Sequence, residues 1–318
     1  MIKNILITNL YPGHLFIIES IIIIFLPKIC SLKYCNIDIE LFDYSKIDDN
    51  SKKPEEFINY MKNKYKNVNF QKRNIEYDYI VDNTAIGSVS PVVILNANCI
   101  INNKEFLEGN YPKNKNIIIS DSKKHYYISH LVEKEFFKDT PNVYYLTPLC
   151  KSKKYFIPSI LPKINKKNTE KLICAVQGNL WLKSRNFKSL IALLETYDNF
   201  YLKLIGRGCL PDFLEKYTKR IIMCNNLQWN DYHKAFEDVY CILPLIDDDF
   251  THEYFTRRLT SSISYVLGYN LKCFYYKKLH EIYGVENSIT YDSNNMVQQF
   301  QKVIDSFYKK KNMVEVKS

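Results

Sequence analysis

The 318-residue sequence lacks the signatures of several large protein classes. Glycine is scarce, at 8 residues, and no G-x-G-x-x-G motif precedes a helix near the start, which argues against a Rossmann dehydrogenase. None of the nine cysteines belongs to a C-x-x-C pair, so a structural zinc site is disfavoured. The longest apolar run, 15–26, contains Glu19 and is too short to span a bilayer of roughly 30 Å. We therefore expect a buried helix there and no transmembrane segment.

The composition is typical of a soluble protein that contains substantial hydrophobic cores. Hydrophobic residues make up 46% of the chain, and the length favours two domains. An odd number of cysteines in a large chain predicts reduced thiols and a cytoplasmic location. The formal charge of +10 reflects lysines in short clusters, such as 151–154 and 309–311, without a basic stripe interleaved with aromatics. This pattern disfavours nucleic acid as a partner and leaves open a peripheral contact with an anionic membrane surface.

Strand-like and helix-like segments alternate along the whole chain. In the first half we expect strands at 3–8, 38–43, 79–82, 92–95, 117–120 and 142–146, and helices at 15–31, 54–65 and 122–137. In the second half we expect strands at 172–176, 201–205, 220–224, 239–245 and 271–275, and helices at 186–197, 211–218, 231–237, 260–268 and 295–310. This alternation predicts an α/β protein with two Rossmann-like, doubly wound domains facing across a cleft.

The regular pattern breaks between 151 and 170, where prolines and charged residues dominate. We interpret this segment as the linker between a first domain, 1–155, and a second domain, 165–300. A terminal helix and tail follow at 295–318. No repeat of solenoid length is present.

Three predicted loops of the second domain follow strands, at the edge where doubly wound sheets bind ligands. The first begins Gln177-Gly178-Asn179 and carries Lys183 and Arg185, a combination suited to a diphosphate. The second is the glycine turn 206–208 around Arg207, and the third is the acidic stretch 247–260.

The third loop leads into Thr260-Ser261-Ser262 at the start of a helix. These hydroxyls can cap the helix or help its free amides to attract phosphate. The acidic stretch can be a solvated surface or can bind Mg²⁺. No group of residues has the spacing of a dedicated metal site.

The order and spacing of these motifs resemble the donor domain of GT-B glycosyltransferases, namely the retaining glycosyltransferase family 4 and its relatives. The resemblance rests on the segments 176–190, 204–208, 232–236, 241–245 and 260–268, and covers roughly 165–300, with a looser match over 1–30. It implies that the second domain binds a nucleotide-diphosphate sugar and the first domain a glycan, glycoprotein or glycolipid acceptor.

The resemblance also implies roles for individual residues. Gly178 and Asn179 would face the donor, with Arg207 and the hydroxyls 260–262 also on the donor side. Lys183 or Arg185 would neutralise the departing diphosphate, and backbone near Leu227 would hold the nucleotide base. Glu253 matches the first of two family glutamates. The second, eight residues later, is replaced by Ser261, a departure that puts the ribose contact and activity in doubt.

The first domain offers fewer candidates for chemistry. Gly13 and His14 follow the first strand and would lie on the acceptor side. Asp121 and His125 follow the predicted strand 117–120 and are candidates for proton transfer, with His130 nearby. A single histidine is more often a packing residue than a catalyst. The resemblance implies front-face transfer with retention, for which we expect no protein nucleophile.

The function that we expect is therefore transfer of a sugar from a nucleotide-diphosphate sugar to an acceptor. Two alternatives remain: a catalytically inactive binding or scaffold protein of GT-B type, and a sugar-nucleotide epimerase with the same two domains. The donor sugar is a substrate, and no cofactor is firmly implied.

Overall fold

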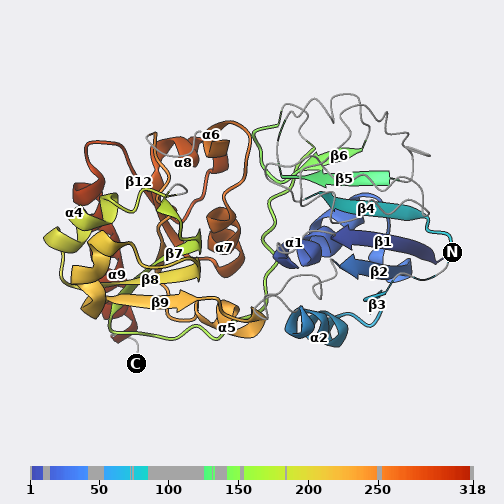
Figure 1. Cartoon of the computed structure of the whole chain (residues 1–318), viewed down its shortest axis with the longest axis horizontal. Coiled ribbons are helices and arrows are strands. Elements are labelled where there is room, and N and C mark those ends of the chain that lie inside the picture. The colour runs from blue at the N-terminus through green and yellow to red at the C-terminus, as the bar shows by residue number, and fades with distance from the viewer. Residues whose placement is uncertain are drawn as a thin grey trace. The chain divides into compact units, whose positions relative to one another are not determined.

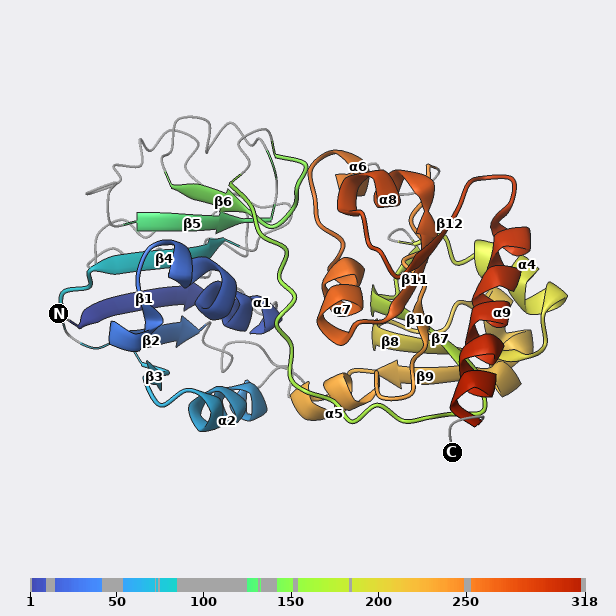
Figure 2. The ribbon, with the colours of Figure 1, turned by 180° about the vertical axis from the view of Figure 1, so that it is seen from behind.

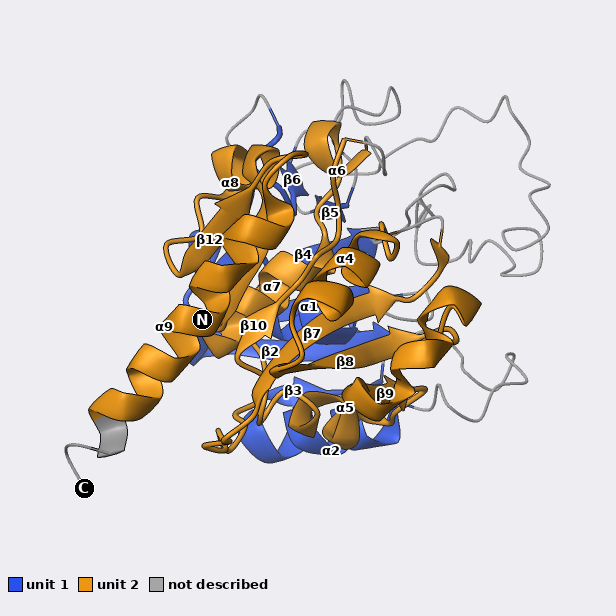
Figure 3. Ribbon diagram, turned by 90° about the vertical axis from the view of Figure 1, so that its left-hand side faces the viewer, with its two compact units in different colours: residues 1–158 blue, residues 159–318 orange. Residues whose placement is uncertain are grey.

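The computed structural model describes residues 2–9, 15–41, 54–71, 73, 75–84, 125–130, 132, 142–150, 154–182, 185–248 and 253–315. The chain divides into two compact units, residues 1–158 and 159–318 (Figure 3). The division lies within the stretch interpreted as a linker. Within the described residues, no helix is both long enough and apolar enough to cross a membrane.

The first unit contains a parallel six-stranded sheet in the order β3-β2-β1-β4-β5-β6 (Figure 1). Its strands are β1 (Lys3–Asn9), β2 (Cys35–Leu41), β3 (Val68–Asn69), β4 (Tyr79–Thr84), β5 (His125–Ser129) and β6 (Val143–Tyr145). The helical segments are α1 (Leu15–Ser20), a π-helical turn (Ile21–Phe25), two 3₁₀ turns (Leu26–Lys28 and Leu32–Tyr34) and α2 (Glu55–Lys64). The apolar run around Glu19 is therefore a buried helical segment, as predicted.

Two predictions for this unit were wrong. Residues 125–129 form strand β5 and not part of a helix over 122–137, because they pair in parallel with β4 and β6. Strand β2 begins at Cys35, three residues earlier than predicted. The predicted strands 92–95 and 117–120 lie outside the described residues.

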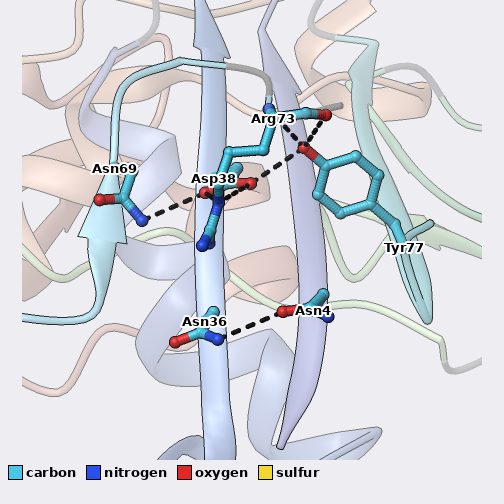
Figure 4. A network of polar contacts seen from close by, with 6 residues as sticks. All are labelled: Asn4, Asn36, Asp38, Asn69, Arg73 and Tyr77. Carbon is cyan, nitrogen blue, oxygen red and sulfur yellow. Dashed lines mark hydrogen bonds and ion pairs between the residues drawn. The ribbon is translucent and has the colours of Figure 1, made fainter. Parts of the chain in front are cut away.

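Buried charge in the first unit is neutralised locally. Glu19 accepts hydrogen bonds from Lys64, Tyr60 and Tyr65, which α2 and the residue after it supply. Asp38 is fully buried in the middle of β2, where the Arg73 Nε lies 2.7 Å from its Oδ2 (Figure 4). The Tyr77 hydroxyl donates to the same oxygen over 2.9 Å. These carboxylates thus have the partners that burial requires.

The second unit contains a parallel six-stranded sheet in the order β12-β11-β10-β7-β8-β9. Its strands are β7 (Leu172–Asn179), β8 (Phe200–Arg207), β9 (Ile221–Asn225), β10 (Cys241–Ile242), β11 (Lys272–Tyr276) and β12 (Ser288–Tyr291). Its helices are α4 (Ser189–Thr196), a 3₁₀ segment (Asp212–Arg220), α5 (Trp229–Lys234), α6 (Glu253–Thr256), α7 (Ser261–Tyr269), α8 (Lys277–Tyr283) and α9 (Met296–Glu315). The predicted fold class, α/β with two Rossmann-like doubly wound units, is confirmed.

Helices cover both faces of the second sheet (Figure 2). One face packs against α4 and α9 through a core that includes Leu190, Leu194, Phe300 and Phe307. On the other face lie α5 and α7: the Gln177 amide of β7 reaches Tyr232 of α5 and Ser262 of α7. Helices on both faces leave the strand ends as the open edge for a site.

Candidate functional site

Strands β7 and β8 each carry a glycine just before their last residue, and the two glycines pair with each other. Gly178 and Gly206 stand opposite in the parallel register, followed by Asn179 opposite Arg207. A Cβ built on Gly206 would lie 1.8 Å from the carbonyl oxygen of Gly178, so only glycine fits there. The predicted loop 177–179 is therefore the end of a strand, and this correction places Gly178 at the carboxyl edge of the sheet.

Arg185 lies against this glycine and joins three segments of the chain. Its Nη1 donates to the carbonyl of Pro244, and its Nη2 donates to the carbonyl of Gln177 and, over 3.4 Å, to the Ser262 hydroxyl. Arg185 thus ties the end of β7 to the segment after β10 and to the first turn of α7. These contacts hold the guanidinium beside Gly178, and the expectation that Arg185 neutralises a departing diphosphate stays a prediction.

The positive charge of Arg185 is buried without a carboxylate partner among the described residues. The side chain is 4% exposed, none of the ion pairs there includes it, and its Nε has no hydrogen-bond acceptor. Burial lowers the pKa of Arg185, but a guanidinium remains charged throughout the physiological range. An isolated buried cation is costly, and a bound anion would offset that cost.

The N-terminus of α7 approaches the same point. The Ser261 Oγ lies 3.5 Å from the position that a Gly178 Cβ would take, and it donates to Gln177 Oε1 over 3.2 Å. Thr260 occupies the N-cap position, yet its buried hydroxyl makes no capping bond and has no partner. The first-turn amides of α7 thus lack a side-chain cap, which leaves the helix dipole available to an anion.

Gln177 is the residue in this arrangement that sequence reasoning placed only in a loop. Its side chain is buried, accepts hydrogen bonds from Ser261 and Ser262, and donates to the Tyr232 hydroxyl over 2.7 Å. Burial raises the pKa of Tyr232, which keeps the phenol neutral. Tyr232 belongs to a segment of the family resemblance, but its link to the site could not be read from spacing.

The segment after β10 is held in an unusual conformation next to Arg185. Leu245 has a φ of 54°, an uncommon value for a residue with a branched side chain. Its carbonyl accepts from the backbone N–H of Asn186 over 2.8 Å, and the Asn186 amide donates to Asp247 over 2.7 Å. Backbone held in this way is typical of functional sites because surrounding contacts must stabilise it.

The acidic stretch does not form a metal site among the described residues. No cluster of three carboxylate, histidine or cysteine side chains suited to a metal ion occurs there. Asp248 accepts hydrogen bonds from Lys278 and Tyr276, and these bonds hold its pKa below the ordinary value, the Lys278 bond most strongly. Asp248 thus has a structural partner, and Asp249 lies outside the described residues.

The remaining donor-side candidates differ in their placement. Glu253 begins α6 and pairs with Arg257 and Arg258, and the hydrogen bond from Arg257 is the main cause of its lowered pKa. Asn179 and Arg207 are exposed at the carboxyl edge, and Leu227 is half-buried in the turn after β9. Lys183 lies outside the described residues.

The acceptor-side candidates of the first unit are less favourably placed. His125 is the first residue of β5 and lies toward the strand's amino end, with its Nε2 4.0 Å from Asp82 Oδ2. The predicted helix over 122–137 is therefore wrong at His125, while the strand 117–120 that it was expected to follow lies outside the described residues. The carboxyl edge instead holds buried polar pairs: Thr8 donates to Asp82, and Asn83 donates to Asn9 over 2.8 Å. Gly13, His14 and Asp121 lie outside the described residues.

Comparisons with known proteins find similarity only among solved structures; no family model and no curated protein matches. The lipopolysaccharide outer core galactosyltransferase WaaB, in its apo form, shares 12% identity and a TM-score of 0.45 over 96% of this chain and 91% of WaaB. The S. aureus MnaA–UDP structure shares 13% identity and a TM-score of 0.45 over 96% of this chain and 88% of MnaA.

A third similar structure is the UDP-GlcNAc 2-epimerase from Neisseria meningitidis bound to UDP-GlcNAc, with 8% identity and a TM-score of 0.43. That match covers 96% of this chain and 93% of the epimerase.

Proposed function

We propose that the chain is a glycosyltransferase that binds a nucleotide-diphosphate sugar at the carboxyl edge of the second sheet. The observation that carries the proposal is the buried cation of Arg185 against Gly178, which has no carboxylate partner among the described residues. Ser261 and the uncapped start of α7 lie next to it. A positive site of this kind fits a diphosphate, because oriented amides and fixed cations stabilise phosphate oxygens.

The same features suit the chemistry of sugar transfer. When the bond between the sugar and the diphosphate breaks, negative charge grows on the departing phosphate. Preorganised dipoles and a fixed charge stabilise that transition state without rearranging. Gly178 has no side chain, so an oxygen of the ligand can approach the backbone and the hydroxyl of Ser261. Arg185 supplies positive charge next to Gly178, and its hydrogen bonds hold the Gln177 carbonyl and the Ser262 hydroxyl in place.

Ser261 stands where the family resemblance predicts a second glutamate, and this replacement affects how phosphate can bind. Ser261 is a neutral hydroxyl 3.5 Å from the built Cβ of Gly178, close to the buried cation. A carboxylate there would compete with a diphosphate for the charge of Arg185. The serine therefore favours phosphate binding, while the ribose must be held by other groups. We propose retention of configuration as the stereochemical outcome, on the family resemblance alone.

Nucleotide binding is the first test. Thermal unfolding is measured with pyrophosphate, UDP, GDP and ADP, and we expect at least one diphosphate to raise the melting temperature in a saturable way. Nucleosides without phosphate serve as the matched control and should leave the melting temperature unchanged. If none of the diphosphates binds, the proposed function is wrong.

Activity is the second test and separates the alternatives. UDP-, GDP- and ADP-sugars are incubated with the protein, with and without an acceptor panel, and followed by proton NMR. Release of the nucleoside diphosphate with a new glycosidic bond supports transfer, and the anomeric coupling constant reports retention. Inversion at C2 of an intact donor would show an epimerase. Saturable binding with neither reaction would show a binding or scaffold protein.

A further inference from the structure

We propose that a basic surface of the second unit docks on a bilayer that contains anionic phospholipid. The basic surface consists of Lys166, Lys309 and Lys310, together with the side chains of Tyr308 and Met313. It is formed by the segment before β7 and by the end of α9, and all three lysines are exposed. Lysine clusters on or beside an amphipathic helix attract anionic lipid head groups. This inference does not depend on the proposed function.

Contacts with the chain between α5 and β10 bring the two segments together. On one side, the Lys166 Nζ lies 3.5 Å from the carbonyl oxygen of Phe236. On the other side, the Tyr240 hydroxyl and the Ser306 hydroxyl of α9 share a hydrogen bond of 2.8 Å. Lys310 is one helical turn after Ser306, on the same face of α9. Figure 2 shows the segment that leads into β7 passing beside the C-terminal end of α9.

The ammonium groups of Lys166 and Lys310 repel each other across this contact. Lys166 is exposed as a residue, but its Nζ lies against the Phe236 carbonyl and 5.8 Å from the centre of the Tyr269 ring. The charged end of the side chain thus gives up part of its hydration. This desolvation, and then the charge of Lys310, lowers the pKa of Lys166 to about 8. An anionic head group beside both lysines would offset the repulsion.

Two carboxylates in the same stretch of chain are paired with other lysines. Glu237 lies 2.8 Å from the Lys167 ammonium, and Asp238 pairs with Lys203. Among the residues that the structure describes, none of the three lysines of the basic surface forms an ion pair. Their positive charge is therefore available to a partner from outside the chain.

The end of α9 adds apolar side chains to this charge. Phe307 is the last residue of α9 in the core of the second unit, and the helix continues beyond it, projecting from the unit in Figure 3. In this part of the helix, Tyr308 is 36% exposed and Met313 is 59% exposed. Met313 is one turn after Lys309, so a cation and an apolar side chain share a face.

This combination favours a bilayer over a nucleic acid. In a helix that lies at a membrane surface, lysines contact the head groups while aromatic and apolar side chains enter the boundary of the acyl chains. A nucleic acid would engage the lysines through its phosphates but would leave Met313 in water.

Vesicle flotation of the full-length protein is the first test. We expect binding to vesicles made of equal amounts of phosphatidylcholine and phosphatidylglycerol, and none to vesicles of phosphatidylcholine alone. Added salt should weaken the binding, because it screens exposed charges. Lys309→Ala combined with Lys310→Ala should weaken it about 30-fold, since each lysine near an anionic surface contributes roughly 5-fold.

The matched control removes two exposed lysines from the opposite edge of the sheet. Lys188→Ala combined with Lys277→Ala lowers the net charge equally, at the starts of α4 and α8, and should keep the wild-type affinity. Circular dichroism verifies that both double variants are folded. Equal vesicle binding by the two double variants would overturn the inference.

Replacement of the apolar side chains distinguishes a bilayer from a nucleic acid. Tyr308→Ser combined with Met313→Ser should weaken vesicle binding about 10-fold, because the side chains that enter the boundary are lost. Tighter binding to duplex DNA than to the anionic vesicles, with wild-type affinity for vesicles in this variant, would overturn the inference in favour of a nucleic acid. Failure to bind anionic vesicles would also overturn it. Neither result would affect the proposed function, which the diphosphate binding screen tests separately.

Discussion

The Arg185 guanidinium lies directly against Gly178: a Cβ built on that glycine would be 2.9 Å from the arginine Nη2. Arg185 also donates to the carbonyls of Gln177, in β7, and of Pro244, in the segment after β10. One side chain thus holds the backbone of the candidate site and supplies its buried charge.

Arg185→Ala is expected to reduce transfer by on the order of 10²-fold, because the fixed charge near the leaving group is lost. Arg185→Lys keeps a charge but cannot donate to both carbonyls with the same planar geometry, so it should restore little of the rate. Steady-state kinetics with the donor identified by the binding screen provide the measurement.

Lys188→Ala removes an exposed cation close by in the sequence and is the matched control for Arg185. Circular dichroism at the assay temperature distinguishes loss of charge from loss of fold. A folded Arg185→Ala variant with the wild-type rate would remove this residue from the site.

Gly206→Ala should destabilise the second unit by about 3 kcal/mol or more, because the new methyl group would meet a backbone oxygen that cannot move away. The built Cβ lies 1.8 Å from the Gly178 carbonyl oxygen, and φ is 157°. Gly284→Ala is the matched control: its φ is 55°, yet nothing lies within 4 Å of the added Cβ. We expect a cost of about 1 kcal/mol there, from backbone strain alone. Equal denaturation midpoints for the two variants would contradict the steric explanation.

The sequence predicted the second unit better than its site. Strands β7 and β8 are buried on both faces and are rich in apolar residues, with Lys203 as the one charged residue before their glycines, which makes them easy to recognise. Strand β12 was missed because three of its four residues are only half-buried, and α8 because seven residues span about two helical turns. Residues 125–129 were misassigned because a short apolar run fits either element until its parallel partners are known.

The position of Arg185 shows why the site itself could not be completed from sequence. Spacing indicates a cation a few residues after a glycine, but it does not say whether the charge points to water. Its burial depends on the Pro244 carbonyl, 59 positions along the chain. Pro244 precedes Leu245, which has a left-handed backbone conformation that no sequence motif predicts. Long-range contacts of this kind arise only when the sheet is assembled.

Asp38→Asn should destabilise the first unit by about 2 kcal/mol, because the fully buried side chain at this position loses its charge-assisted hydrogen bonds from Arg73 and Tyr77. In the native network, Asp38 accepts from Arg73, Tyr77 and Asn69 (Figure 4). Hydrogen exchange of the β1 and β2 amides, combined with chemical denaturation, reports this unit specifically. Asn36→Ala, in the same strand, breaks only a neutral bond to Asn4 and should cost about 1 kcal/mol. Similar exchange rates in both variants would contradict the ion-pair role.

His233 should make the second unit less stable in mild acid. Its ring is buried between α5 and α7 and bonds to the Tyr269 hydroxyl, and burial lowers the pKa of His233 to about 3. In the unfolded chain the pKa of histidine is about 6.5, so below that pH the unfolded state takes up a proton that the folded state does not. The free energy of unfolding should then fall with a slope that approaches about 1.4 kcal/mol per pH unit as the pH drops from 6.5 to 4.5.

The measurement is the pH dependence of urea denaturation for the wild type and His233→Phe. We expect the phenylalanine variant to have a shallower slope in this window, whatever its stability at pH 7, because it cannot bind the proton. Phe236→Leu alters the packing of the same aromatic cluster without a titratable group, so its slope should match the wild type. Carboxylates of lowered pKa, such as Glu237, also change the free energy of unfolding with pH. They take up protons in the unfolded state mainly below pH 4.5, so the interval above pH 4.5 reports chiefly the histidine. Parallel slopes for the wild type and His233→Phe would mean that the folded protein accommodates a charged imidazole. The burial of the His233 ring between α5 and α7 would then not lower its pKa as stated.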